Sequence, residues 1–114
     1  MQKKFVVWFR DVDREDIAIV GGKGANLGEM TKAGFPVPNG FIVTADAYYT
    51  FLDENKLHEK IRALLENLDV SQSKALDAAA KKIQHIITHA NFPREISRDI
   101  IDASRDMVAQ QAAE

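Results

Sequence analysis

Residues 19–30 read Ile-Val-Gly-Gly-Lys-Gly-Ala-Asn-Leu-Gly-Glu-Met, a glycine-rich segment with one lysine among its glycines. Glycines allow backbone N–H groups to approach an anion closely, and the start of a helix adds the positive end of its dipole. A lysine about 4 Å from a phosphate charge gains roughly 4 kcal/mol at an effective dielectric constant of 20, before desolvation. The dipole adds only about 0.3–2 kcal/mol. Lys23 would therefore contribute most if this segment binds phosphate.

The spacing of the glycines matches neither of the common phosphate-binding motifs. A Walker A loop requires Ser or Thr directly after its lysine, and this chain has Gly24 there. The dinucleotide-binding fingerprint requires a third glycine at position 27, which is Leu, and the nearest glycine is Gly28. On spacing alone, phosphate binding and a purely structural turn are both open.

The residues on either side of this segment predict two strands with a short helix between them. Residues 5–9 are β-branched and aromatic, which predicts a buried strand. We expect a helix over residues 24–33, with Gly34 at its C-terminal cap. Two prolines stiffen the turn that follows, and residues 41–43 predict the second strand.

The rest of the chain predicts helices, because all six glycines precede residue 45. Thr44 is suited to be the N-cap of a helix that extends to about residue 54. Apolar residues at helical spacing predict three further helices, which cover residues 57–68, residues 73–89 and the residues after Pro93. The polar tail, residues 110–114, is expected to fray. The predicted fold class is therefore α+β and mostly helical, with two short strands and about five helices.

Two short strands are too few to make a stable sheet by themselves. Five helices can cover far more surface than these strands offer, so we expect other strands of the same sheet to lie outside this chain. Unpaired backbone groups at the edge of a strand can hydrogen-bond another strand. We therefore expect self-association or partner binding through that edge.

Composition excludes several classes of function. The chain has no cysteine, which rules out disulfides, thiolate zinc sites and thiol nucleophiles. A net charge of −2 argues against a broad nucleic-acid-binding surface, so no nucleic-acid partner is expected. The first apolar run is too short for a signal-peptide core or a membrane span. We expect a cytoplasmic protein with no membrane partner.

The histidines and the acidic run are candidates for metal binding, and both have a simpler interpretation. His85 and His89 have the spacing of paired helical ligands, but no third ligand is evident. We interpret these two and His58 as parts of a solvated helix face. The acidic residues between positions 11 and 16 alternate with apolar and basic ones, which is typical of a polar connecting loop.

Aromatic and basic side chains in the helices have equally simple interpretations. Tyr48, Tyr49 and Phe51 could stack on a base, but packing in the core is the simpler explanation for all three. The arginines of the last predicted helix alternate with acidic residues, which is typical of a solvated face and not of a phosphate groove. These arginines are Arg94, Arg98 and Arg105.

Taken with its neighbours, the glycine-rich segment resembles the start of the pyruvate phosphate dikinase, PEP/pyruvate-binding family. The resemblance extends from Val20-Gly-Gly-Lys-Gly-Ala-Asn-Leu-Gly-Glu-Met30 through Gly34-Phe-Pro-Val-Pro-Asn-Gly40 to Ala45-Asp-Ala-Tyr48. Val7-Trp8-Phe9 and Asn91-Phe-Pro93 are more similar to the phosphoenolpyruvate synthases of that family than to the dikinase that uses orthophosphate. Rifamycin-inactivating phosphotransferases share the glycine-lysine segment and are an alternative.

The resemblance implies an ATP-grasp nucleotide-binding domain, of which residues 1–114 would be the N-terminal part. In this family ATP donates its β-phosphoryl group through a histidine on a swivelling domain. A synthase converts pyruvate, ATP and water to phosphoenolpyruvate, AMP and phosphate. Of the family's nucleotide-contacting residues only the lysine, at Lys23, falls inside this chain, and Gly21, Gly22 and Gly24 would shape its loop.

Most of the family's catalytic parts have no counterpart in this chain. They include a strand with an Arg-Ser-Ser-Ala-type motif, the carboxylates that hold Mg²⁺, the phosphocarrier histidine and the pyruvate-binding barrel. We therefore expect ATP as ligand, Mg²⁺ held by residues elsewhere, the remaining domains of the enzyme as partners, and no activity of this chain alone. The 114 residues are assigned no catalytic or metal-binding residue. The alternative is a stand-alone binding module that kept the glycine-lysine segment but lost the chemistry.

Overall fold

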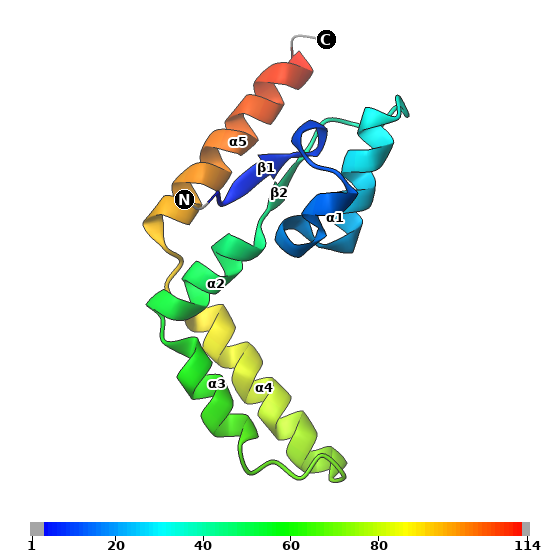
Figure 1. Ribbon diagram of the computed structural model, residues 1–114. Helices are drawn as coiled ribbons and strands as arrows, with labels where there is room; N and C mark the ends of the chain where they lie inside the picture. Colours follow the sequence, from blue (N-terminus) through cyan, green and yellow to red (C-terminus); the bar gives the residue numbers. More distant parts are fainter. Residues whose placement is uncertain (1–3, 113–114) are drawn as a thin grey trace. The chain divides into compact units, whose positions relative to one another are not determined.

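The computed structural model describes residues 4–112, and the chain divides into two compact units. The first unit combines Met1–Tyr49 with Pro93–Glu114, and the second contains Thr50–Phe92. In chain order the elements are β1 (Val6–Trp8), the 3₁₀ turns η1 (Phe9–Asp11) and η2 (Arg14–Asp16), α1 (Ile17–Lys32), β2 (Phe41–Val43), α2 (Ala45–Glu54), α3 (Leu57–Leu65), α4 (Ser73–His89) and α5 (Arg94–Ala112) (Figure 1). Two strands and five α-helices within the described residues confirm the predicted mostly helical α+β class.

The strands β1 and β2 form an antiparallel pair. Val7 lies opposite Ile42, and Trp8 lies opposite Phe41. Strand β1 is one residue shorter at each end than the predicted strand over residues 5–9. At its C-terminal end, Phe9 already belongs to η1. Within residues 4–112 neither strand has another partner strand, so self-association through an edge stays a prediction.

The two faces of this strand pair are apolar. Opposite partners point to the same face of an antiparallel pair, so Val7 and Ile42 share one face. The side chain of Ile42 lies against Gly24, which places α1 on that face. The rings of Trp8 and Phe41 pack edge to face on the other side, with centroids 5.7 Å apart.

Helix α1 is longer than predicted and is broken inside. It begins at Ile17, whereas the helix was expected from residue 24. Gly21 has φ 76° and ψ 172°, a conformation that only glycine adopts readily, and it separates two helical stretches. The prediction therefore identified the second stretch and missed the first. The expected C-terminal cap is confirmed, since Gly34 follows the helix with φ 90°.

The acidic run before α1 connects β1 to α1, as predicted, and contains parts of two short 3₁₀ turns, η1 and η2. Asp13 caps η2 by accepting a hydrogen bond from the N–H of Glu15 at 2.9 Å, and the carboxylate of Asp16 accepts one from the N–H of Asp13 at 3.0 Å. Lys32 donates to Asp13 at 3.3 Å. The N–H of Glu15, and next Lys32, hold the pKa of the Asp13 carboxyl below its usual value. Capping gives this run a structural role.

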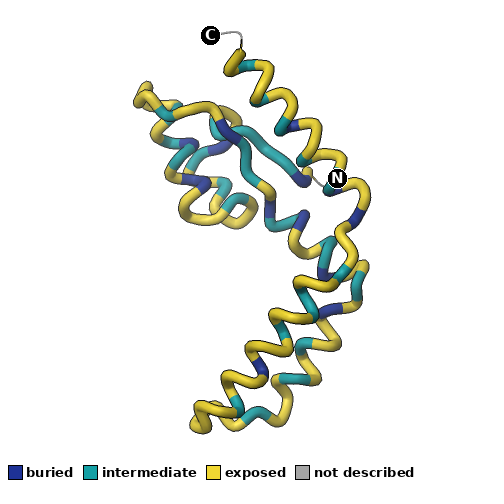
Figure 2. Tube along the Cα trace, turned by 180° about the vertical axis from the view of Figure 1, so that it is seen from behind, coloured by how far each residue is buried: buried dark blue, intermediate teal, exposed yellow. Residues whose placement is uncertain are grey.

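The core of the first unit joins the residue just before β1 to helices α2 and α5. Phe5, Ala47 and Ile96 are buried together, and Ile100 of α5 packs against them. Figure 2 shows the buried positions at intervals along the helices, with exposed positions between them. Within residues 4–112, no helix combines the length and the apolar character needed to cross a membrane.

Thr44 is the N-cap of α2, as predicted. Its hydroxyl donates to the carbonyl of Lys4 at 2.5 Å and accepts from the N–H of Ala47 at 3.3 Å. Only 2% of Thr44 is exposed, so a lost hydrogen bond would not be replaced by water. This one hydroxyl ties the start of β1 to the start of α2.

We expect Thr44→Val to lower the free energy of unfolding by about 1–2 kcal/mol, because it keeps the shape and removes both hydrogen bonds. Urea unfolding followed by circular dichroism measures the change. Thr31→Val is the matched control, since the Thr31 hydroxyl bonds only the carbonyl of Leu27 in its own helix. Equal losses in the two variants would contradict the capping role.

In the second unit α3 and α4 form a helical hairpin with Leu57 and Ala79 buried. The side chain of Asn55 closes the unit, because it donates to the carbonyl of Asn91 at 2.8 Å and accepts from its N–H at 3.0 Å. Lys56, between α2 and α3, adopts a left-handed conformation with φ 54°. Helix α4 has the predicted bounds, whereas α3 ends at Leu65, three residues before the predicted end.

The end of α5 differs from the prediction. The tail was expected to fray from residue 110, but α5 continues to Ala112. Gln110 accepts a hydrogen bond from the side-chain amide of Asn39, a contact that sequence spacing does not reveal. Residues 113 and 114 lie outside the described residues.

Candidate functional site

The predicted phosphate-binding segment lies at the break in α1. Gly21 ends the first helical stretch, and the second stretch begins at Gly22. Gly21, Gly22 and Lys23 are exposed, whereas Gly24 is buried. The first N–H groups of a helical stretch have no acceptor within it. The segment therefore combines backbone donors with a lysine at an exposed position.

Different physical constraints favour glycine at different positions of α1. Gly21 needs its positive φ. At Gly24 a Cβ atom would lie 3.0 Å from the Cδ1 atom of Ile42 and 3.0 Å from the Cβ atom of Val20, so close packing favours glycine there. Gly22 has no positive φ, and a Cβ atom on it would meet nothing within 4 Å. Within the described residues, neither backbone conformation nor packing requires glycine at position 22.

The charge of Lys23 is exposed to solvent. It takes part in none of the salt bridges found among residues 4–112. Two other pairs in the same unit, Arg14 with Glu29 and Lys32 with Asp13, involve α1 and leave Lys23 aside. An incoming anion would therefore not have to displace one of these carboxylates.

The histidines lie on exposed helix surfaces, which confirms the solvated face that was predicted. His58 contacts Asp53, with 3.1 Å between its Nε2 atom and a carboxylate oxygen. The rings of His85 and His89 stack with centroids 3.9 Å apart. Among residues 4–112, no three His, Asp or Glu side chains gather in a way that could hold a metal ion.

The prediction that Tyr48 and Tyr49 pack in the core is wrong. They are 52% and 53% exposed, and their rings contact each other with centroids 5.6 Å apart. Helix α2 points Ala47 into the core, which turns the two following residues outward. Phe51 is half-buried, and its ring contacts that of Phe92, which is 55% exposed, so its burial is only partial.

The arginines of α5 are exposed together with their acidic neighbours, so the predicted solvated face is confirmed. A groove between α3 and α4 was not predicted. It is lined by Leu64, Lys81, Lys82, His85 and Ile86. Its only signal in the sequence is the placement of Lys82 and Ile86 one helical turn apart.

Comparison with known proteins identifies the family. Residues 17–114 match the sequence family described as pyruvate phosphate dikinase, AMP/ATP-binding domain. The chain belongs to this family. The match includes the break in α1 together with Lys23, so the predicted segment lies inside the dikinase-type AMP/ATP-binding domain.

Relatives with curated names agree with the family match. The chain is 48% identical over 100 residues to a probable phosphoenolpyruvate synthase of Methanocaldococcus jannaschii, covering 88% of this chain and 8% of that protein. It is 43% identical over 106 residues to a probable phosphoenolpyruvate synthase of Staphylothermus marinus, covering 93% and 13%. It is 41% identical over 113 residues to the phosphoenolpyruvate synthase of Neisseria meningitidis, covering 96% and 14%. The predicted resemblance is confirmed, and the chain spans less than a sixth of each of these relatives.

Proposed function

We propose that this chain is the N-terminal part of the ATP-grasp nucleotide-binding domain of a phosphoenolpyruvate synthase. Such an enzyme converts ATP, pyruvate and water to phosphoenolpyruvate, AMP and phosphate. The family match supports a role in binding AMP or ATP. The names of the relatives favour a synthase over a rifamycin phosphotransferase. Their much greater length supports further domains as partners of this one.

Within this domain we assign phosphate binding to Lys23 and the glycines around it. The observation that supports the assignment is the exposed start of the second stretch of α1. A Cβ atom at Gly22 would meet nothing within 4 Å, and the side chain of Lys23 is exposed to solvent. A phosphate can approach the backbone closely at Gly22 because no Cβ atom is present. Gly21 and Gly24 set the position of this turn, the first by its positive φ and the second by packing on Ile42.

In this proposal Mg²⁺ is held by residues of the remaining domains, and this chain contributes contacts to the phosphates. Positioning and charge neutralisation are most of what a phosphoryl-transfer enzyme supplies, and they need several cationic groups at once. Lys23 would be one of them, and we expect no ATP turnover by the 114-residue chain alone.

Titration of the isotope-labelled 114-residue chain with Mg-ATP tests the assignment by nuclear magnetic resonance. One exposed lysine and a few N–H groups must offset several kcal/mol of lost freedom, so we expect binding no tighter than about millimolar, roughly −4 kcal/mol. The shifted signals should belong to residues 21–25. They should be lost in Lys23→Ala and kept in Lys32→Ala, which removes another exposed lysine of the same helix. Shifts elsewhere, or shifts unchanged in Lys23→Ala, would remove Lys23 from the site.

A further inference from the structure

The C-terminal end of α4 brings two imidazole rings together. His85 and His89 are four residues apart, so they lie on the same face of the helix. Both residues are exposed, and their ring centroids are 3.9 Å apart with 29° between the ring planes. The pair belongs to the second unit, whereas Lys23 belongs to the first, so it has no part in the ATP proposal. One helical turn therefore presents two imidazoles to solvent at the same place.

A hydrogen bond to the backbone fixes the proton on one of these rings. The Nδ1 atom of His89 lies 2.9 Å from the carbonyl oxygen of His85. A carbonyl oxygen only accepts, so Nδ1 carries the proton and the Nε2 atom of the neutral ring keeps a free lone pair. Histidines that bind metal ions commonly donate their other ring N–H to a carbonyl or carboxylate, which orients the ring. His89 is therefore oriented as a metal ligand through Nε2.

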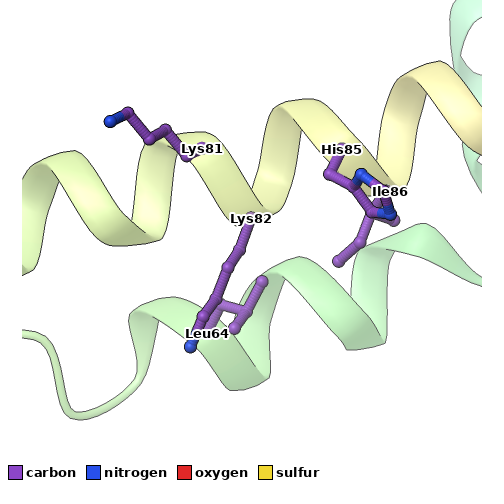
Figure 3. Close-up of a pocket in the computed structure, with 5 residues that line it drawn as sticks. All are labelled: Leu64, Lys81, Lys82, His85 and Ile86. Carbon is purple, nitrogen blue, oxygen red and sulfur yellow. The ribbon is translucent and has the colours of Figure 1, made fainter.

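The charged groups around the pair leave the rings accessible to a cation. Lys81 and Lys82 lie about one turn before His85, and in Figure 3 both lysine side chains extend away from the His85 ring. No salt bridge found among residues 4–112 involves His85 or His89. An incoming ion would therefore not have to displace a carboxylate from either ring.

We propose that His85 and His89 together bind a divalent transition-metal ion of the group Zn²⁺, Cu²⁺ and Ni²⁺. Imidazole nitrogen suits these ions, whereas Mg²⁺ prefers oxygen ligands. Two histidines at this spacing on one helix face hold zinc in helical metalloprotease motifs. Nitrogens about 2.0–2.1 Å from a tetrahedral zinc ion are roughly 3.3 Å apart. That separation is close to the 3.9 Å between the ring centroids, so small ring rotations bring both nitrogens onto one ion.

The pair is a binding site without the hydrolytic chemistry of those motifs. They place a Glu general base directly after the first histidine, and this chain has Ile86 there. Among residues 4–112, no third His, Asp or Glu side chain joins the pair. Water would fill the remaining coordination positions of the ion.

Titration of the isotope-labelled 114-residue chain with zinc chloride, in a buffer without ATP, tests the pair by nuclear magnetic resonance of the imidazole signals. We expect the signals of His85 and His89 to shift together, to return when EDTA is added, and to be unaffected by magnesium chloride. His85→Ala and His89→Ala should each weaken zinc binding about tenfold or more, because a single imidazole no longer chelates the ion. His58→Ala is the matched control, since His58 is an exposed histidine of the same unit that contacts Asp53.

A further variant tests the spacing without reducing the number of histidines. Gln84 is exposed on α4, and Gln84→His combined with His85→Ala moves one ring about 100° around the helix. We expect this double variant to bind zinc as weakly as His85→Ala alone. Circular dichroism of each variant checks that these exposed substitutions leave the helices intact.

Three results would overturn the proposal. One is the absence of shifts at His85 and His89 at millimolar zinc, or a shift of only one of the two rings. Another is a loss of zinc binding in His58→Ala as large as in the variants of the pair, or full affinity in the double variant with altered spacing. The third is an equal response to magnesium chloride, which would indicate general attraction of cations and not coordination by imidazole.

Discussion

Lys23→Ala in the complete enzyme is expected to lower ATP-dependent turnover by about 10²–10³-fold, the usual loss when one preorganised donor to a developing charge is removed. The expectation rests on the proposed role of Lys23 at the phosphates. Because the side chain is exposed and joins none of the salt bridges among residues 4–112, its removal should leave the unfolding temperature unchanged. Steady-state turnover at saturating pyruvate, with thermal unfolding of the same preparations, measures both quantities.

Lys32→Ala is the matched control for this experiment. Lys32 is also an exposed lysine of α1, but it is the last residue of the helix and forms a salt bridge with Asp13. An exposed ion pair contributes little to stability because water and salt screen it, so this variant should keep its turnover and lose little stability. Full turnover in Lys23→Ala, or the same loss in both variants, would show that Lys23 has no special position at the phosphates.

Gly28→Ala is expected to destabilise the fold by about 3 kcal/mol or more. A Cβ atom at this position would lie 2.2 Å from the backbone oxygen of Val12 and 2.7 Å from its carbonyl carbon. Backbone atoms cannot move aside as a flexible side chain can, so α1 would have to shift away from the segment before it. Urea unfolding of the 114-residue chain measures the loss.

Gly22→Ala is the matched control, because it makes the same chemical change in the same helix. A Cβ atom there meets nothing within 4 Å, and the backbone has no positive φ. Alanine is the better helix former by about 1 kcal/mol, so stability should stay the same or increase slightly. A large loss in Gly22→Ala, or none in Gly28→Ala, would contradict the packing that distinguishes the two glycines.

Much of this fold could be predicted from the sequence because it depends on neighbours along the chain. The bounds of α4 follow from apolar residues at helical spacing and from the break at Pro93. Thr44 begins α2 and Gly34 ends α1, as their capping chemistry predicts. The exposed position of Lys23 in a glycine-rich turn also followed from local residue types, and the same residues carried the resemblance that the family match confirms.

Other features could not be predicted from the sequence, either because the local pattern is weak or because distant residues decide them. The first stretch of α1 was missed because its helical start and the positive φ of Gly21 leave no clear pattern in the sequence. The outward position of Tyr48 and Tyr49 depends on which side of α2 meets Phe5 and Ile96, and periodicity alone does not specify that side.

Sequence by itself determined the helices, their caps and the family, because periodicity, capping and motif residues act between near neighbours in the chain. Only the tertiary structure separated the glycines of α1 by role. Gly24 and Gly28 are glycines because Ile42 and Val12 approach them from outside the helix, whereas Gly22 has open space. The groove between α3 and α4 likewise exists only once the two helices pack side by side and bring Leu64 to Ile86. Contacts between residues far apart in the chain therefore determine both the roles of these glycines and the presence of the groove.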